Sequence, residues 1–245
     1  MNRIGFSTGA LAYGDFQRGV HLQERPGIDA IELSALRESE LDDLVASLDR
    51  LKLDQFSYRS FHAPSNLENL SSTDLAEKLL PVARKGFSII VHPDVLGEDL
   101  QPWRLLGDRL LLENMDTRKR VCRTAREMRW FFNELPAARF CFDIGHARQV
   151  DATMTVAFEF LQLFGSRLAE VHISEVNWEC KHRRIGTAAA LSYHKAARWI
   201  PSDVPVIIES VVEEDEIDRE LSTVKRCLNA ASSFFSSCVK SVIGT

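Results

Sequence analysis

Short apolar runs recur along the chain, and longer amphipathic stretches separate them. Each run is four to six residues long, is rich in β-branched or bulky side chains, and in most cases ends in a polar or ionisable residue. Near-continuous apolar runs are typical of strands that are covered on both faces, as in a parallel sheet. The sequence therefore predicts eight strands, at residues 4–7, 30–34, 58–62, 88–92, 109–113, 140–143, 169–173 and 205–209.

The stretches between these runs carry helical periodicity. Between residues 38 and 53, apolar side chains recur at positions 41, 44, 45, 48 and 51, a spacing that places them on one face of a helix. A second helix is predicted to begin at Ser72, where capping and acidic residues gather. Further helices are predicted at 124–135, 151–164, 188–200 and 214–228, with a helix of only a turn or two between residues 99 and 107.

Strands that alternate with helices indicate βαβ units and hence a parallel sheet. Eight such units within 245 residues fit a closed barrel better than an open sheet. The Gly-x-Gly-x-x-Gly turn that a dinucleotide-binding sheet carries after its first strand is absent. We therefore predict an α/β fold, a (β/α)8 TIM barrel, as a single domain over residues 1–245. The serine-rich segment from Ala230 is expected to pack irregularly on the outside of the barrel.

Composition and charge narrow the class of protein. Apolar residues make up 45% of the chain and charged residues 27%, as in ordinary soluble domains. The net charge of -5 disfavours a nucleic-acid partner, although metal ions in an acidic site can still receive phosphates. No apolar stretch approaches the roughly 20 residues that span a bilayer, and no signal peptide is evident. Five scattered cysteines indicate reduced thiols, and Cys141 is expected to point into the barrel, one pleat below Asp143. We expect a cytoplasmic protein without a membrane partner, and the sequence leaves its oligomeric state open.

Histidines and carboxylates gather at the predicted strand ends, where such barrels hold their active sites. A single histidine there is commonly structural, but a carboxylate after three apolar residues needs a partner. Imidazoles beside carboxylates suit Zn²⁺, Mn²⁺, Fe²⁺ or Co²⁺ rather than Ca²⁺ or Mg²⁺ alone. We therefore predict a catalytic site that binds one to three divalent metal ions. Its predicted ligands are His62, His92, Glu113, Asp143, His146, His172, His182 and Glu209.

Other residues near these ends are candidates for binding substrate. Arg183 and Arg184 follow His182, so at least one of them is placed to reach a substrate anion. Glu32, at the end of the second predicted strand, either touches substrate or braces the barrel, and Asn114 follows a predicted ligand. The basic run 118–120 is interpreted as a solvated face, with contact to a phosphate as the alternative.

Several short motifs recur at the predicted strand ends. They are Ser60-Phe-His-Ala-Pro64, Val91-His-Pro93, Leu112-Glu-Asn114, Cys141-Phe-Asp-Ile-Gly-His146, Val171-His-Ile-Ser174 and Ile208-Glu209. Together they resemble the xylose isomerase-like barrels, a superfamily that includes sugar isomerases, epimerases and endonuclease IV. The resemblance runs from the first predicted strand to the last, and the Asp-x-x-His and Val-His-Ile-Ser pieces are its most specific parts.

The resemblance implies two different metal sites. Epimerase-like members hold one metal, and their ligand positions match Glu113, Asp143, His172 and Glu209; the two glutamates, Glu113 and Glu209, also move protons at the substrate carbon. Endonuclease IV-like members hold three metals with further histidines, which match positions 62, 92, 146 and 182 here. Their remaining ligand is an aspartate two residues before the last histidine. This chain has Cys180 there, so the resemblance implies a third site that is altered or lost.

Three functions follow from these patterns. The acidic chain and the four-ligand core favour a metal-dependent isomerase or epimerase that acts on a small sugar or sugar phosphate by carboxylate-mediated proton transfer. The additional histidines favour the alternative, an endonuclease IV-like phosphoester hydrolase with several metals. A barrel that binds metal without catalysis is the third. The partner is expected to be a small carbohydrate or phosphorylated molecule, since basic, aromatic loops for gripping DNA are missing.

Overall fold

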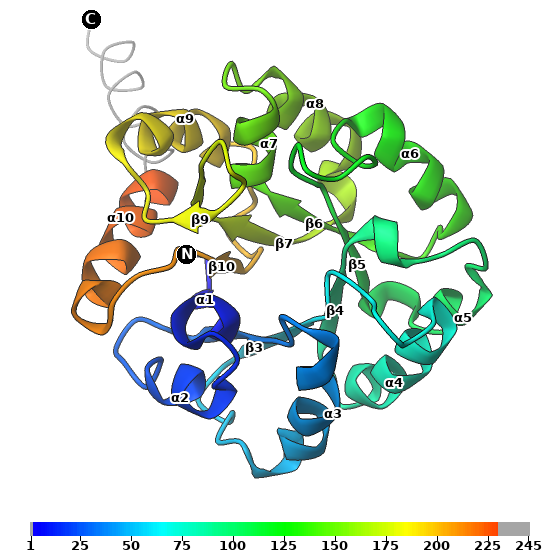
Figure 1. The fold of residues 1–245 in the computed structure, drawn as a ribbon. Helices are drawn as coiled ribbons and strands as arrows, with labels where there is room; N and C mark the ends of the chain where they lie inside the picture. Colours follow the sequence, from blue (N-terminus) through cyan, green and yellow to red (C-terminus); the bar gives the residue numbers. More distant parts are fainter. Residues whose placement is uncertain (1, 230–245) are drawn as a thin grey trace, which may run out of the picture.

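The computed structural model describes residues 2–229 as a ring of eight parallel strands with helices around it, viewed along the barrel axis in Figure 1. All eight predicted strands are present within about one residue of their expected bounds, so the predicted (β/α)8 barrel is confirmed. The strands are β1 (Ile4–Phe6), β2 (Ala30–Ser34), β3 (Tyr58–His62), β4 (Ser88–Val91), β5 (Leu110–Glu113), β6 (Arg139–Asp143), β7 (Leu168–Ile173) and β10 (Val206–Ile208).

Strands that are consecutive in the barrel pair in parallel, and β10 pairs with β1 to bring the ends of the sheet together. The seam between β1 and β2 is joined by a single bridge between Ser7 and Glu32. At this seam a side chain on Gly5 would place its Cβ only 1.8 Å from the carbonyl oxygen of Ala30. Glycine at position 5 therefore lets the two backbones approach closely enough to close the barrel.

The helices follow the predicted order with two informative differences. The helix predicted over 38–53 ends at Ser47 and continues as a 3-10 turn, and the one predicted from 151 begins at Thr155. Its start is displaced because the Asp151 carboxylate accepts hydrogen bonds from the backbone N–H groups of Thr153 and Val156. The outer helices are α3 (Glu38–Ser47), α4 (Ser72–Arg84), α5 (Gln101–Arg104), α6 (Ala125–Glu134), α8 (Thr155–Phe164), α9 (Thr187–Ala197) and α10 (Ile217–Asn229).

Five further elements lie near the carboxyl ends of the strands or between β1 and β2, and the apolar pattern did not predict them. They are too short for a helical or strand period to stand out. They are the helices α1 (Thr8–Ala12), α2 (Phe16–His21) and α7 (Ile144–Val150), and the two strands of a small hairpin, β8 (Glu175–Val176) and β9 (His182–Arg183).

The apolar core lies mostly outside the strands, between the sheet and the helices. Phe140 from β6, for example, contacts Phe132, Phe160 and Phe164 from the surrounding helices. Within the barrel the apolar cluster is much smaller and consists of Ile90, Leu111, Cys141 and Ala169. The prediction that Cys141 points into the barrel is confirmed, and the interior above this cluster is polar.

No helix among residues 2–229 is long and apolar enough to cross a membrane. The serine-rich segment that was expected to pack on the outside lies beyond the described residues.

Candidate metal centre

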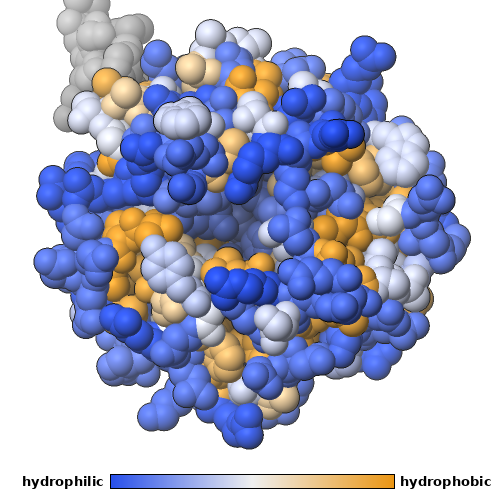
Figure 2. Space-filling view, viewed as in Figure 1, coloured by the Kyte–Doolittle hydropathy of each residue, from blue (hydrophilic) through white to orange (hydrophobic). Residues whose placement is uncertain are grey.

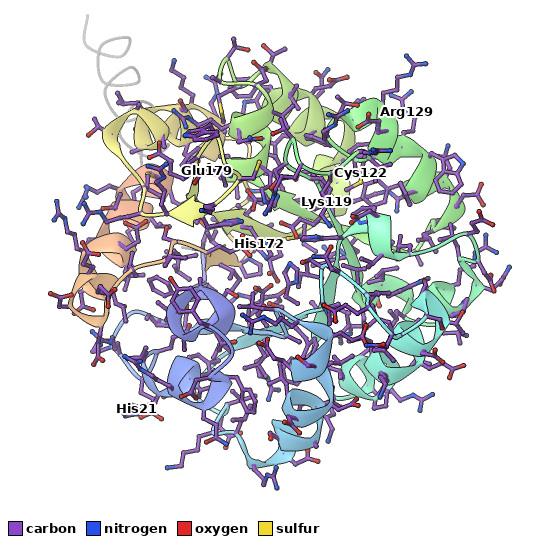
Figure 3. The ribbon with its side chains drawn as sticks, viewed as in Figure 1. His21, Lys119, Cys122, Arg129, His172 and Glu179 are labelled. Atoms are coloured by element: carbon purple, nitrogen blue, oxygen red, sulfur yellow. The ribbon has the colours of Figure 1, made fainter. Side chains whose placement is uncertain are left out.

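All eight predicted metal ligands lie together at the carboxyl end of the barrel. Six come from the ends of β3 to β7 and β10, and the other two come from the unpredicted elements α7 and β9. Figure 3 shows His172 near the centre of this face, with His21 at the periphery. Three groups of these ligands have one donor atom each within 4.8 Å of one another: His62, Glu113 and His172; Asp143, His146 and His182; and Glu113, Asp143, His172 and Glu209.

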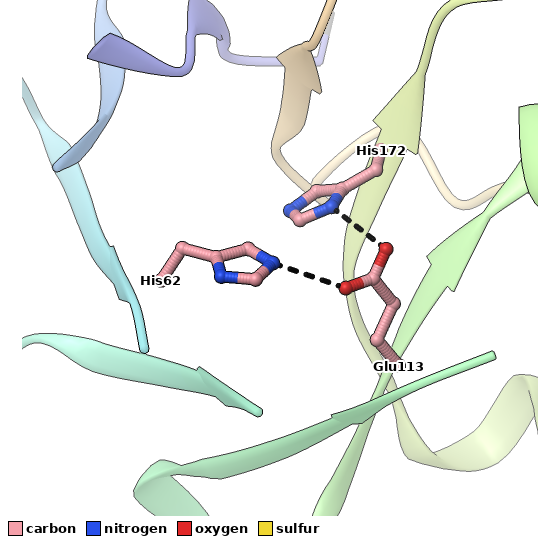
Figure 4. Close-up of side chains that lie close together, drawn as sticks. All are labelled: His62, Glu113 and His172. Atoms are coloured by element: carbon pink, nitrogen blue, oxygen red, sulfur yellow. Dashed lines mark hydrogen bonds and ion pairs between the residues drawn. The ribbon is translucent and has the colours of Figure 1, made fainter. Parts of the chain in front are cut away.

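The carboxylate of Glu113 lies at the centre of the cluster, and its two oxygens face different histidines. Oε2 lies 3.2 Å from Nε2 of His62 and 3.1 Å from Nε2 of His92. Oε1 lies 3.3 Å from Nδ1 of His172 and 3.4 Å from Nδ1 of His146. Figure 4 shows two of these contacts on opposite sides of the carboxylate. Glu113 therefore joins two sets of donors.

The contacts of His62 require a proton or a metal ion between its ring and Glu113. Nδ1 of His62 lies 2.8 Å from the carbonyl oxygen of Ala63, which can only accept, so Nδ1 carries a proton. In the neutral ring Nε2 is then a bare lone pair, yet it faces a carboxylate oxygen. Two acceptors repel each other unless a proton or a metal ion lies between them.

The ring of His172 is oriented by Glu170, a carboxylate that the sequence analysis did not predict. Its Nε2 donates to Oε1 of Glu170 at 2.8 Å, and Oε2 of Glu32 lies 3.1 Å away. Glu170 is fixed in turn by the hydroxyl of Tyr58, which donates to its Oε2 at 2.5 Å. Nδ1 of His172 is thereby left to face Glu113 and Glu209, the latter at 3.4 Å. A carboxylate behind a histidine is the arrangement that orients metal-ligating imidazoles.

The spacing of these atoms fits a divalent transition metal. Bonds of about 2.0–2.2 Å from a tetrahedral metal to nitrogen and oxygen place neighbouring ligand atoms about 3.3–3.6 Å apart. The distances from Glu113 to its four histidines, and from Nδ1 of His172 to Glu209, lie between 3.1 and 3.4 Å, close to that range. Several donor atoms are also buried without a hydrogen-bond partner, among them Oδ2 of Asp143, Oε2 of Glu209 and Nε2 of His146. The donor set therefore fits Zn²⁺, Mn²⁺ and related ions.

The pKa values of the carboxylates in the cluster are shifted in opposite directions. Burial raises the pKa of Glu113, but the charges of His172 and His92 overcome that effect and hold it well below the usual range. Burial raises the pKa of Glu209 well above its usual value, and that of Asp143 is raised in the same way. Burial thus favours the protonated forms of Asp143 and Glu209, and a bound cation would favour their charged forms.

The pKa values of the histidines also shift in opposite directions. Burial lowers the pKa of His172, but the acidic groups around it, Cys141, Glu209, Glu32 and Glu113, raise it well above its usual value. Burial, aided by the charge of His146, lowers the pKa of His182 to about 3. His182 is therefore a neutral ring, which is the form that ligates metal.

Asn114, predicted to bind substrate, uses its whole amide to align β5 with β6. The amide nitrogen donates to the carbonyl oxygen of Asp143 at 2.8 Å, and the amide oxygen accepts from the N–H of Asp143 at 2.9 Å. Asp143 in turn caps α7 by accepting the N–H of His146 at 2.7 Å. Asn114 therefore positions Asp143, and Asp143 in turn positions His146.

The other predicted substrate-binding residues lie below or beside the centre. Glu32 is fully buried beneath His172, whereas Arg183 is exposed and Arg184 pairs with Glu216 on the surface. The cavity above the donors measures about 530 Å³, and the described residues that line it include none of these three. Cys180, the possible altered ligand, is buried, and its Sγ contacts Thr117 and Gln149.

Two cations and an apolar wall border this cavity instead. Arg118 and Lys181 line one side of it, and Tyr13 and Leu36, both with exposed side chains, line another. Figure 2 shows the depression at the centre of this face, with hydrophilic residues over most of its rim. The cavity therefore combines metal donors at its floor with cationic groups and an apolar surface at its mouth.

No protein-family model and no curated protein matches this sequence. Solved structures match its fold. Endonuclease IV from Thermus thermophilus superposes with a TM-score of 0.59 at 19% identity, covering 92% of this chain and 98% of that one. SacUVDE gives a TM-score of 0.55 at 12% identity, covering 92% and 98% of the two chains.

A xylose isomerase-like TIM barrel protein from Mycobacterium smegmatis, in complex with magnesium, gives a TM-score of 0.52 at 15% identity, covering 88% of this chain and 89% of that one. At the level of the fold, the resemblance to the xylose isomerase-like barrels is confirmed. This chain shares that fold and brings clusters of possible metal ligands together at the end of the barrel where predicted.

Proposed function

We propose that the chain is a divalent-metal-dependent phosphoester hydrolase whose centre holds more than one ion. The position of Glu113 carries the proposal, since one of its oxygens faces His62 and His92 and the other faces His172. A carboxylate between two donor sets is a bridging ligand, and paired metals are typical of phosphoester hydrolysis. A one-metal isomerase site would leave His62 and His92 without a role.

The roles of the donors follow from their contacts. His62, His92 and Glu113 would hold one ion, and Glu113, Asp143, His172 and Glu209 would hold another. Ions bound there would supply a water nucleophile of lowered pKa and would neutralise phosphate oxygens. Glu170 and Glu32 fix the orientation of His172 from below. Among the ligands Glu209 lines the cavity and has a buried, unpartnered Oε2, so it is placed to take up a proton from water or to return it.

The cavity favours a small phosphorylated substrate. Arg118 and Lys181 provide positive charge at its mouth, where an anionic group would lie, and Tyr13 offers a ring for an apolar or sugar face. The net charge of -5 disfavours a nucleic-acid duplex as the substrate. The described cysteines, Cys122, Cys141, Cys180 and Cys227, are all free and buried, which supports a reducing compartment such as the cytoplasm.

The test is to measure metal content and activity on the same preparation. Protein purified without chelator would be analysed for metal per chain, and then assayed with small phosphomonoesters and phosphodiesters and with a duplex containing an abasic site. We expect at least two ions per chain and hydrolysis of small phosphoesters that is lost with Glu209→Gln. A single ion per chain, with no phosphoester cleaved, would contradict the proposal.

A metal-dependent isomerase or epimerase is the second candidate, favoured by one observation. Glu113 and Glu209 lie close together, at 3.3 and 3.4 Å from Nδ1 of His172, and both line the cavity, so two carboxylates are available for proton transfer to a bound sugar. Incubation with small ketoses or their phosphates in deuterated water separates the two candidates. Solvent deuterium appearing at the substrate carbon, and disappearing with Glu209→Gln, would favour the isomerase.

A further inference from the structure

The two cations at the mouth of the cavity come from different loops. Arg118 lies in the loop between β5 and α6, and Lys181 lies in the turn of the β8–β9 hairpin. Lys181 pairs with Glu179 in an exposed ion pair, which is weak enough in water for a phosphate to replace it. Two cations on separate loops can bind one anionic group together only if the loops hold fixed positions relative to each other.

The thiol of Cys180 joins these two loops. Cys180 directly precedes Lys181 and is only 3% exposed. Its Sγ lies 3.4 Å from Oγ1 of Thr117, the residue before Arg118, and 3.2 Å from Nε2 of Gln149 in α7. The side chain is therefore directed at the first loop, and none of the groups of possible metal ligands among the described residues includes it.

Gln149 completes the connection and anchors it to the barrel. Its Oε1 accepts the backbone N–H of Thr117 at 3.1 Å, and its Nε2 donates to the hydroxyl of the same residue at 2.7 Å. Gln149 belongs to α7, whose first turn is capped by Asp143 at the end of β6. Thr117, Gln149 and Cys180 thus form a thiol cluster, in which each side chain contacts the other two, next to the barrel wall.

The backbone at Cys180 indicates that its side chain is needed. Its φ of 56° lies in the left-handed region, which costs a residue with a Cβ free energy that glycine does not lose. The turn keeps this conformation because Asn177 accepts two hydrogen bonds, at its carbonyl oxygen from the N–H of Cys180 at 2.9 Å and at its Oδ1 from the N–H of Lys181 at 2.8 Å. A glycine at position 180 would fit the turn without strain, so the contacts of the thiol are what a cysteine adds.

Arg118 itself is held by a buried carboxylate. Its Nε and Nη2 donate to Oδ2 of Asp116 at 2.9 and 2.7 Å, and Asp116 is only 1% exposed. Burial lowers the pKa of Arg118, but the hydrogen bonds to Asp116, together with the nearby Cys180, raise it above its usual value. The guanidinium is thus fixed at the mouth of the cavity, with Cys180 among its neighbours.

We propose that Cys180 is a positioning residue for substrate binding, which sets the distance between Arg118 and Lys181 so that the two cations hold one phosphate group together. The thiol acts through Thr117 and Gln149, without touching the substrate or a metal ion. The inference rests on the proposed hydrolase for its substrate, a phosphoester. Binding of a phosphate group by the two cations can also be measured without turnover, so the two proposals are tested separately.

The experiment measures KM and kcat for phosphoester cleavage, and the dissociation constant of inorganic phosphate by calorimetry, on the metal-loaded full chain. Cys180→Ala and Gln149→Ala each remove contacts of the thiol cluster. In both we expect KM and the dissociation constant of phosphate to rise by about 10-fold, the scale of one charge-assisted hydrogen bond, with kcat and metal per chain unchanged. Cys227→Ala, which removes another buried thiol in α10, is the matched control and should leave both constants unchanged.

Further variants separate the role of the thiol from a merely structural one. Cys180→Ser keeps a side chain that can accept the same hydrogen bonds, so it should restore both constants to within about 2-fold of the wild type. Cys180→Gly relieves the backbone strain but lacks the thiol, so it should behave as Cys180→Ala does. In a chain that carries Arg118→Gln, Cys180→Ala should add much less to either constant, because the thiol acts through the placement of that cation.

Three outcomes decide between the proposals. Wild-type binding of phosphate in Cys180→Ala and Gln149→Ala would overturn the positioning role. Loss of metal in Cys180→Ala, with metal retained in Gln149→Ala, would also overturn it, since the thiol would then be a ligand. If no phosphoester is cleaved but the phosphate titrations follow the expected pattern, the proposed hydrolase is wrong and the positioning role stands.

Discussion

The two sides of the barrel wall bury very different residues. Outside the strands, a continuous apolar layer packs against the helices, with Phe140, Phe142 and Phe160 at its centre. Inside, the apolar cluster has only four members, and acids and histidines occupy the space above them. The outer layer therefore stabilises the fold, which allows the inner face to hold ionisable groups that cost stability unless they are paired or bound to metal.

The largest effect is expected on the inner side, at Glu113. Glu113→Gln keeps the size of the side chain but removes the charge that joins the two donor sets. We expect metal per chain to fall and phosphoester cleavage to decrease by at least about 10³-fold, the scale of losing one preorganised electrostatic group. The matched control is Glu134→Gln on the surface of α6, which should change neither. Full metal content in Glu113→Gln would show that this carboxylate is not the bridge.

The outer layer is tested by Phe160→Ala. Phe160 is fully buried and contacts Phe140, Phe142 and Phe164, so its truncation leaves a cavity. We expect the free energy of unfolding in urea to fall by about 3–5 kcal/mol, with metal per folded chain unchanged. Leu163→Ala on the exposed face of the same helix should cost much less. A loss of metal in the folded Phe160→Ala protein would mean that the two sides are not independent.

Removing metal from the inner side should lower the thermal stability of the whole fold. Chelation should leave the centre with several buried ionisable groups and no ion, and it also removes binding energy, about 2.7 kcal/mol for a metal at 100 times its dissociation constant. We expect a decrease in Tm of roughly 5–10 °C in the wild type. In Glu113→Gln, chelator should shift Tm much less. An equal shift in both proteins would indicate that chelation acts away from this centre.

Variants of Glu170 and Tyr58, which hold His172 from below, should have a smaller effect on metal affinity. Glu170→Gln weakens the acceptor that orients His172, so we expect the dissociation constant for metal to rise by about 10- to 100-fold, measured by titration with a competing chelator. Tyr58→Phe leaves Glu170 in contact with His172 and removes only the hydroxyl behind it, so its effect should be smaller. The reverse order of the two variants would place Tyr58, and not Glu170, as the main support.

Most of the fold followed from the sequence because each strand is an apolar run, and the gathering of the eight candidate ligands followed because six of them stand at strand ends. That these residues bind metal stays a prediction. Glu170 shows what was missed and how it could have been found. It lies two residues before His172, and side chains two apart in a strand share a face, so an acid there is directed at the same interior.

Arg183 and Arg184 were predicted to bind substrate only because they follow His182 in the sequence, and neither lines the cavity. His182 and Arg183 are the two residues of β9, and consecutive side chains in a strand point to opposite faces, so a ligand at 182 directs its neighbour outward. Arg183 is accordingly exposed, and Arg184 pairs with Glu216. Arg118, one of the two cations that do line the cavity, comes from the run that was interpreted as a solvated face.

The smallest expected effect is on KM, and it distinguishes Arg118 from Arg184. Arg118→Gln removes a charge from the mouth of the cavity, and losing a charge-assisted hydrogen bond to a phosphate should raise KM by about 10-fold or more. Arg184→Gln should leave KM within about 2-fold of the wild type, because its partner Glu216 lies at the surface, away from the donors. Since Arg118 also holds Asp116, metal content must be measured in parallel. A higher KM at unchanged kcat and with two ions retained would assign Arg118 to substrate binding. If Arg184→Gln raised KM and Arg118→Gln did not, the anionic group would lie beside Arg184 and not beside Arg118 as proposed.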